Sequence, residues 1–204
     1  MDRQRVVMFI LLVFGVLTSD AHQLQFREGD VVFLVSPSPH TDPILLATKS
    51  QIGHVGMVLK HNGALMIFEA VSPVKYTPID VWTKKQEGKH FMVRRLTDAK
   101  SILTPSNLLR LDSAASVMEG RPYDSWYNWS DEKLYCSELV WKIFDRVLDV
   151  KLCNLRKMRD YDLSSPEVQK RLKERFPGGA PLDEMVVSPQ DIYESNQLVT
   201  VYQQ

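Results

Sequence analysis

The chain has 204 residues, of which 44% are hydrophobic and 25% are charged, and its 25 basic and 25 acidic residues leave no net charge. This length suits one well-buried domain and does not require two. A neutral chain without a sustained basic stripe is not expected to bind nucleic acid. The composition is that of an ordinary globular protein.

The first 21 residues differ from the rest. Arg3 and Arg5 precede an apolar run from residue 6 to residue 17, and small residues follow up to Ala21. A basic start, a short apolar core and small residues before a cleavage point are typical of a secretory signal peptide. We expect cleavage after Ala21 and a mature domain, residues 22–204, that is secreted or periplasmic and not stably inserted in a membrane. A membrane anchor is the alternative, although the run is short for a span of about twenty residues.

The first half of the mature chain predicts mostly strands. A short apolar run at residues 31–35 indicates a buried strand, a proline-rich loop follows, and residues 44–49 form a short helix. Residues 53–59 and 64–71 are two apolar strands separated by Asn62-Gly63. Asn-Gly between apolar runs is a strong hairpin signal, because both residues accept a positive φ.

The second half predicts mostly helices. Prolines bracket a loop at residues 73–78, and a helical turn and a strand follow. Helical spacing of apolar residues then predicts several helices, and the whole pattern favours one domain of α+β class. The expected elements are a turn at 79–82, a strand at 90–96, and helices at 105–119, at about 131–148, at 166–176 and from Ser188-Pro189 onward.

Cys136 lies at the start of the most amphipathic of these helices. Leu139, Val140, Ile143 and Phe144 recur at helical spacing, and counting back along this stripe places Cys136 on the inward side. Unpaired backbone N–H groups at a helix start stabilise a thiolate, so this is a suitable place for a cysteine nucleophile. An ordinary buried cysteine would have the same pattern.

The hairpin places a histidine beside an acid. With a two-residue loop at positions 62 and 63, paired residues have numbers that sum to 125, so His54 and Glu69 are diagonal neighbours on one face. A carboxylate that accepts a hydrogen bond from an imidazole fixes the orientation of the ring, as in a catalytic triad. Gly56, beside both, leaves room for a substrate or another side chain. His54 by itself is also compatible with a half-exposed strand histidine.

The two cysteines, Cys136 and Cys153, are expected to be free thiols, because the helix between them would hold them farther apart than a disulfide spans. The five histidines are scattered, and none pairs with a cysteine at ligand spacing. We therefore predict no metal and no other cofactor.

Three separated blocks resemble a known family. They are Gly53-His54-Val55-Gly56-Met57, residues 68–78, and Gly120-Arg-Pro-Tyr123 with Tyr135-Cys136-Ser137-Glu138. The cysteine block resembles the NlpC/P60 superfamily of papain-like enzymes. Its position after the histidine resembles the circularly permuted branch, the bacterial amidases of the YaeF/YiiX type. The resemblance runs from about Gln25 to the C-terminus and implies an antiparallel sheet packed against a nucleophile-bearing helix.

The resemblance also implies roles for particular residues. Cys136 matches the nucleophile, His54 the general base, Glu69 the residue that orients it, and Tyr123 a tyrosine near the thiol that helps to bind the oxyanion. Glu138 stands where the usual motif has glycine, so the resemblance does not imply that this chain cleaves cell-wall peptides.

The implied activity is hydrolysis of an amide through a thioester, on a small peptide, an acyl-amino-acid or a lipid-like substrate. We expect Lys75 and Tyr76, in the loop at 72–78, to contact the substrate on one rim of the site. A lipid-directed thioesterase or acyltransferase and a catalytically silent binding module are the alternatives. A long apolar channel would favour lipid and a short polar groove would favour peptide. The sequence does not predict an oligomeric state.

Overall fold

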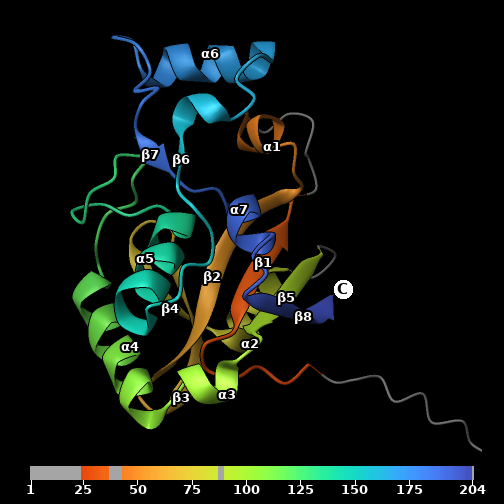
Figure 1. Ribbon diagram of the computed structural model, residues 1–204, viewed down its shortest axis with the longest axis vertical. Helices are drawn as coiled ribbons and strands as arrows, with labels where there is room; N and C mark the ends of the chain where they lie inside the picture. The colour runs from red at the N-terminus through yellow and green to blue at the C-terminus, as the bar shows by residue number, and fades with distance from the viewer. Residues whose placement is uncertain (1–23, 37–42, 87–89, 204) are drawn as a thin grey trace, which may run out of the picture.

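The computed structural model describes residues 24–36, 43–86 and 90–203, so the expected signal peptide lies outside the described residues. Within these ranges the main sheet has six antiparallel strands in the order β4-β3-β2-β1-β5-β8 (Figure 1). Their bounds are Val31–Val35 (β1), Ile52–His61 (β2), Ala64–Ala70 (β3), Val74–Pro78 (β4), Phe91–Leu96 (β5) and Leu198–Gln203 (β8).

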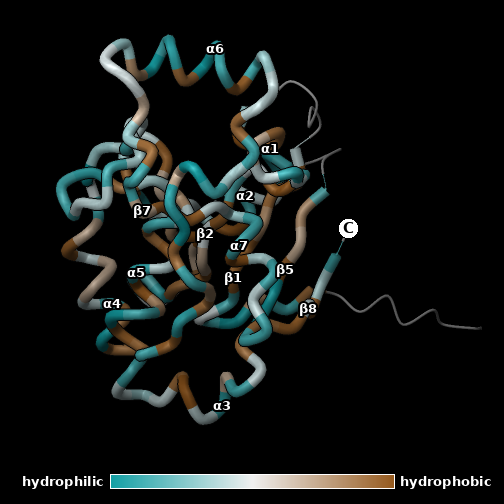
Figure 2. The backbone as a smooth tube through the Cα atoms, turned by 45° about the horizontal axis from the view of Figure 1, so that its top comes forward, coloured by the Kyte–Doolittle hydropathy of each residue, from teal (hydrophilic) through white to brown (hydrophobic). Residues whose placement is uncertain are grey.

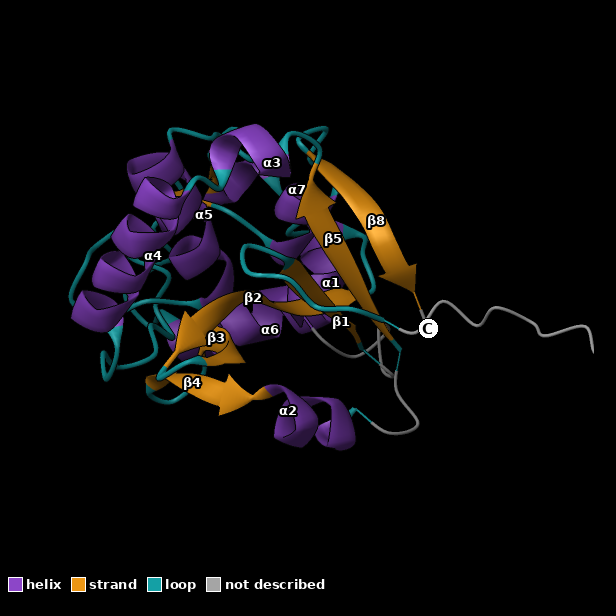
Figure 3. Ribbon diagram, turned by 90° about the horizontal axis from the view of Figure 1, so that it is seen from below, coloured by secondary structure: helices purple, strands orange, loops and turns teal. Residues whose placement is uncertain are grey.

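Helices cover both faces of this sheet (Figure 3). The helices α4 (Pro105–Met118) and α5 (Cys136–Leu148) contribute to the larger hydrophobic cluster. On the other side α2 (Ile79–Lys85) packs against β3 and β4, and its Trp82 belongs to a second, smaller cluster. An antiparallel sheet packed against the helix that carries Cys136 is the α+β architecture that the sequence predicts.

The β2–β3 hairpin has the register that its turn dictates. Met57 pairs with Phe68 and His61 with Ala64, so the numbers of paired residues sum to 125 as predicted. The φ angles of Asn62 and Gly63 are 49° and 84°. Two consecutive positive φ angles are what a type I′ turn requires, and this turn matches the natural twist of the two strands. The register decides which side chains of β2 and β3 share a face.

The helix α5 begins later than the sequence suggested. Its first residue is Cys136 and its N-cap is Tyr135, so the expected start near residue 131 is wrong. The physical reason lies in Asp131, whose carboxylate accepts hydrogen bonds from Lys142 and Arg146 along the side of the helix instead of starting it. The correction places Cys136 at the first helical position, where the backbone N–H groups are unpaired.

Most of the loop expected at residues 73–78 is a strand, β4, which spans Val74–Pro78. In β4, Lys75 pairs with Glu69 and Tyr76 with Phe68 across to β3. The prolines suggested a loop because proline cannot donate to a sheet ladder. Here Pro73 precedes the strand and Pro78 is its last residue, and β4 is an edge strand, where proline is tolerated.

A separate set of elements lies at the upper end of the molecule in Figure 1. There α1 (Pro43–Thr48) contacts α6 (Pro166–Arg175), close to the two-stranded sheet of β6 (Arg156–Lys157) and β7 (Met185–Val186). Hydrophobic and hydrophilic residues alternate along α6 in Figure 2, as expected of a helix with one apolar side.

The sequence predicted α1, α6 and the short helix α7 (Pro189–Tyr193) close to their observed bounds. It missed the helix α3 (Ala99–Ile102), the 3-10 helix η1 (Met158–Asp160) and the strands β6, β7 and β8.

Candidate active site

The thiol of Cys136 lies at the N-terminus of α5, on the inward side of the helix. The residue is 5% exposed. Backbone N–H groups of Val55, in β2, and of Ser137, in the helix itself, donate hydrogen bonds to its sulfur. Both donors and the positive end of the helix dipole favour the anionic form of the thiol.

His54 connects this thiol to a buried acid. Its Nε2 lies 2.9 Å from Oε2 of Glu69, and the side chain also hydrogen-bonds with Cys136. The structure therefore brings together all three residues in the order cysteine, histidine, glutamate. The His54–Glu69 contact is the one that the hairpin register predicts, because the two residues lie on the same side of neighbouring strands.

Two further side chains hold Glu69 in place. The hydroxyl of Thr77, in β4, donates to Oε1 at 2.7 Å, and the indole N–H of Trp82, in α2, donates to Oε2 at 3.2 Å. Both donors are buried, and so is the carboxylate. These donors were not identified in the sequence analysis, since the segment that carries Thr77 was expected to be a loop. A carboxylate with three donors is both oriented and kept ionised.

The charges of the three residues depend on one another. Burial opposes a charge on His54, but the hydrogen bonds and charges of Cys136 and Glu69 outweigh it and raise the pKa of the imidazole to about 10. Burial would raise the pKa of the Cys136 thiol, and the hydrogen bond and charge of His54 lower it below its ordinary value. The pKa of Glu69 is lowered in the same way, against burial, by His54 and then by Thr77. The three shifts together favour a thiolate beside an imidazolium and an ionised carboxylate.

Tyr123 lies next to the thiol, as its match to the family motif implies. Its hydroxyl hydrogen-bonds with Cys136, and burial together with the charge of Cys136 raises the pKa of the phenol above its ordinary value. The hydroxyl is therefore protonated over the useful pH range and is available as a donor. An isolated bridge between Tyr123 and Leu134 ties its segment to the residues that lead into α5.

Glu138, where the family motif usually has glycine, is a structural residue in this fold. It is fully buried, and its Oε2 accepts from the backbone N–H of Tyr135 at 3.3 Å, which satisfies one group at the start of α5. Its Oε1 lies 2.6 Å from Nζ of Lys142, one turn along the helix and also fully buried. The carboxylate thus points along the helix and away from the substrate side of Cys136.

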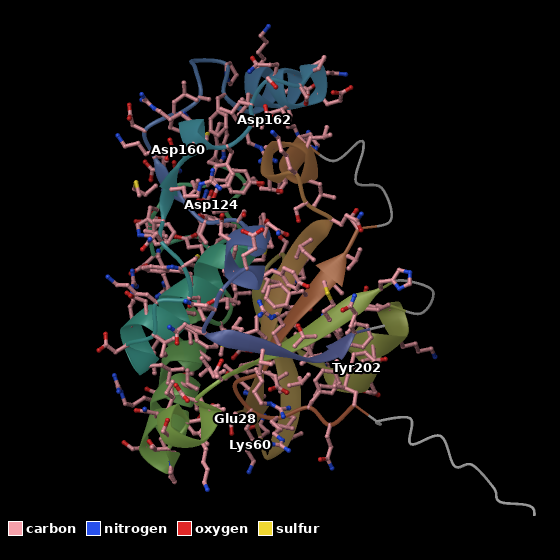
Figure 4. All side chains as sticks on the ribbon, turned by 45° about the vertical axis from the view of Figure 1, so that its right-hand side comes forward. Glu28, Lys60, Asp124, Asp160, Asp162 and Tyr202 are labelled. Carbon is pink, nitrogen blue, oxygen red and sulfur yellow. The ribbon has the colours of Figure 1, made fainter. Side chains whose placement is uncertain are left out.

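A pocket opens beside Cys136, between α1, α6, η1 and the segment leading into α7, and it has about 870 Å³ of empty space when its open, solvent-filled mouth is included. Its walls include Gly53 of β2, Tyr123 and several apolar side chains of the upper elements. Two contacts of Asp162 connect the segments that form these walls. Asp162, labelled in Figure 4, pairs with Lys49 at 3.0 Å, and its backbone N–H donates to the carbonyl of Ala47 at 2.9 Å. These contacts join the segment before α6 to α1.

Three residues expected to bind substrate do not line this pocket. Lys75 is exposed on the edge strand β4, and the ring of Tyr76 stacks on His61 with centroids 4.0 Å apart. Gly56 is buried against β3, where an added Cβ would lie 3.1 Å from Cγ2 of Ile67. Glycine is needed there for the close approach of two strands rather than for a substrate.

The two thiols are free in the structure, Cys136 buried and Cys153 half-buried. Among residues 24–36, 43–86 and 90–203, no three His, Cys, Asp or Glu side chains lie together in a way that could hold a metal ion.

Comparison with known proteins agrees with the family resemblance of the sequence. The family model described as permuted papain-like amidase enzyme, YaeF/YiiX, matches residues 25–202. The chain is 40% identical over 192 residues to the uncharacterized protein YiiX of Escherichia coli, covering 94% of each chain. A crystal structure described as metalloprotein YiiX from Escherichia coli O157:H7 is similar with a TM-score of 0.80 and 39% identity, over 89% of this chain and 99% of that one.

The word metalloprotein applies to that relative. In this chain, the donor side chains of the described residues do not come together in a set that fits a metal ion. The family model spans the sheet, the helix α5 and the whole Cys136 site, and the relatives extend over nearly the full chain. The chain therefore belongs to the permuted papain-like amidase family of the YaeF/YiiX type.

Proposed function

We propose that the protein is a cysteine hydrolase that cleaves an amide bond through Cys136, His54 and Glu69. The observation that carries the proposal is the buried chain of contacts from the Cys136 thiol through His54 to a carboxylate that two further donors hold. A buried carboxylate with a neutral histidine would be costly, so this arrangement favours the ion pair that thiol catalysis uses.

In the first half of the reaction the Cys136 thiolate attacks the carbonyl carbon of the amide. The Tyr123 hydroxyl and backbone N–H groups at the start of α5 donate to the oxyanion that forms. As the C–N bond breaks, the His54 imidazolium gives its proton to the leaving nitrogen. The product amine departs, and the acyl group remains on Cys136 as a thioester.

In the second half a water molecule replaces the amine. Neutral His54 takes a proton from the water, the oxygen attacks the thioester carbonyl, and the C–S bond breaks to release a carboxylic acid. The thiolate and the imidazolium are restored together. Glu69 keeps the ring oriented in both halves and stabilises its charged form, as the acid of a triad does.

The acyl-enzyme can be tested with p-nitrophenyl acetate as the probe. We expect intact-mass analysis to show one acetyl group, peptide mapping to place it on Cys136, and neutral hydroxylamine to remove it. His54→Ala should slow acetylation strongly, whereas Cys153→Ala should behave as the wild type. Acetylation shared between Cys136 and Cys153, or unaffected by loss of His54, would contradict the proposal. A silent binding module would show no acetylation of Cys136 at all.

A further inference from the structure

The two residues that flank Cys136 in the sequence both bond to one residue of a distant segment. The hydroxyl of Ser137 donates to the backbone carbonyl of Val187 at 2.7 Å. The hydroxyl of Tyr135 accepts from the backbone N–H of Val187 at 3.2 Å. Tyr135, Ser137 and Val187 are all buried. Both main-chain groups of Val187 are therefore paired with the neighbours of the nucleophile, and we call these two contacts the Val187 clamp.

Val187 belongs to a segment that is held on both sides. Before it, β7 ends at Val186 and pairs with β6. After it, Ser188 is the N-cap of α7, and its hydroxyl and backbone N–H donate to the carboxylate of Asp191 at 2.6 and 2.8 Å. The helix α7 in turn packs against β2 and α5 (Figure 1). Val187 is thus a fixed point in the fold to which a helix end can be tied.

The clamp acts at the turn of α5 that most needs such an anchor. Cys136 is the first residue of this helix and Tyr135 is its N-cap. Helix ends fray, because the backbone N–H groups of the first turn have no partners within the helix. Glu138 accepts from the Tyr135 N–H, but it belongs to the same turn. Only a contact to another part of the fold fixes the direction in which the whole turn points, and the clamp provides two.

The direction of these N–H groups matters more for acyl transfer than for forming the thiolate. The oxyanion that forms on the substrate is stabilised only by donors that point at the position it will occupy. A misplacement of about 1 Å can lower the rate on the order of a hundredfold. Against burial, the charge on the Cys136 sulfur is supported first by His54 and only then by the backbone N–H groups of Val55 and Ser137. A loosened first turn would therefore slow acylation and leave the thiolate largely intact.

We propose that Tyr135 and Ser137 are positioning residues, which through Val187 aim the backbone N–H groups of the first turn of α5 at the oxyanion. The role rests on the proposed function, in which an oxyanion forms during acyl transfer. Neither hydroxyl transfers a proton. Burial and the charge of Glu138 raise the pKa of the Tyr135 phenol above its ordinary value, so that the clamp stays neutral and intact over the useful pH range.

Two reactions of the same thiol separate positioning from thiolate formation. Acetylation of Cys136 by p-nitrophenyl acetate passes through an oxyanion, whereas alkylation by iodoacetamide displaces iodide and forms none. Ser137→Ala and Tyr135→Phe each remove one contact of the clamp. We expect each variant to be acetylated at least tenfold more slowly, on the order of what a small misplacement costs. Alkylation should stay within about twofold of the wild type, and neither pH profile should move, because the thiolate is kept.

Other variants calibrate the two readouts. Ser195→Ala is the matched control, because Ser195 is also buried and its hydroxyl accepts from the backbone N–H of Gln197, away from α5. Both of its rates should equal those of the wild type. His54→Ala is the opposite case, which should slow acetylation and also move the alkylation profile. The double variant Ser137→Ala with Tyr135→Phe should lose less than the product of the two single effects, because both hydroxyls hold Val187.

The outcomes distinguish the clamp from the proposed function. If wild-type Cys136 is acetylated and the two clamp variants react as fast, the clamp has no role in catalysis and the hydrolase stands. If acetylation and alkylation fall together, the two residues only maintain the fold. If the single effects multiply fully in the double variant, the hydroxyls do not act through Val187. Absence of acetylation in the wild type would overturn the proposed function itself, and the clamp with it.

Discussion

Cys136 and Cys153 show how neighbours decide the chemistry of a thiol. Burial and the nearby charge of Asp191 raise the pKa of Cys153 to about 12. Cys136 is more deeply buried, yet its pKa is lowered because His54 provides a hydrogen bond and a positive charge. Burial alone would have made both thiols inert.

We therefore predict different alkylation of the two thiols by iodoacetamide. The rate at Cys136 should reach its plateau below the ordinary thiol pKa of 9.0, since the thiolate forms early beside the imidazolium. Above about pH 10, where His54 loses its proton, hydrolysis of amides should fall because the leaving nitrogen lacks a proton donor. In His54→Ala the alkylation plateau should move above 9.0, because burial then acts unopposed. A profile for Cys136 that resembles Cys153, or that does not respond to this substitution, would argue against the ion pair.

Thr77 offers a test of positioning. Thr77→Val keeps the shape of the side chain but removes the donor to Glu69, so the pKa of Glu69 should rise and that of His54 should fall. We expect kcat to drop about tenfold, equivalent to about 1.4 kcal/mol, with little change in KM, and the alkaline limb of the pH profile to move down from about pH 10. Thr83→Val is the matched control, because the Thr83 hydroxyl bonds to the Ile79 carbonyl of its own helix. Equal effects of the two substitutions would mean that Thr77 is merely structural.

At the scale of elements, the helix α5 carries an ion pair inside the protein. Glu138 and Lys142 are both fully buried, and Lys142 also bonds to Asp131 at 2.8 Å. Burial raises the pKa of Glu138 to about 7, although Lys142 acts in the opposite direction. Glu138 also holds the first turn of the helix by accepting a hydrogen bond from the Tyr135 N–H. The pair therefore helps to position Cys136 from the side of the helix that faces away from the substrate.

Removing one partner of this pair should be costly. Lys142→Met leaves the Glu138 carboxylate buried without its cation, and we expect a loss of about 3–5 kcal/mol in the free energy of unfolding. The double variant Glu138→Leu with Lys142→Met should recover much of this loss. Denaturant unfolding measures both, and a single variant that costs less than about 1 kcal/mol would show that the pair contributes little.

The same pair has a pH signature whose sign follows from the raised pKa. Because the pKa of Glu138 is higher in the folded protein than its ordinary value of 4.5, its contribution to stability is complete below pH 4.5 and is lost as the pH rises through about 7. Glu138→Gln should remove this part of the pH dependence between those two values.

At the scale of the whole molecule, the site depends on parts that are far apart in the sequence. His54 and Glu69 come from the β2–β3 hairpin, Trp82 from α2 on one face of the sheet and Cys136 from α5, which packs against β2 and β3. The pocket needs α1 and α6, which lie side by side at the upper end in Figures 1 and 2 although more than a hundred residues separate them.

We propose that the mature domain works outside the cytoplasm. No helix of the described residues is long and apolar enough to cross a bilayer. The basis for export is the pattern of the first 21 residues. Expression of the full chain in a bacterial host should give a processed protein whose N-terminal sequence begins at His22 and which is released with the periplasmic fraction. Retention of the first 21 residues with the membrane fraction would support an anchor instead.

Several features could be predicted because they depend on residues close together in the sequence. Asn62-Gly63 sets the turn, the turn sets the register, and the register puts His54 beside Glu69. The amphipathic stripe after Cys136 likewise predicts a helix with an inward thiol. Both features depend on residues close together in the chain and on the fixed periods of strand and helix.

Other features depend on contacts between distant segments, and these only the tertiary structure decided. The strand β4 exists because β3 offers it a partner, and β8 exists because β5 does. Thr77 and Trp82 meet Glu69 by virtue of how β4 and α2 pack on β3, and Arg175 reaches the pocket because α6 packs on α1. The sequence by itself determined the pairing of His54 with Glu69 and the inward position of the Cys136 thiol, since turn geometry and helical periodicity act over a few residues. Burial, long-range pairing and the loss of solvent decided the charges of these groups and the walls of the pocket beside them.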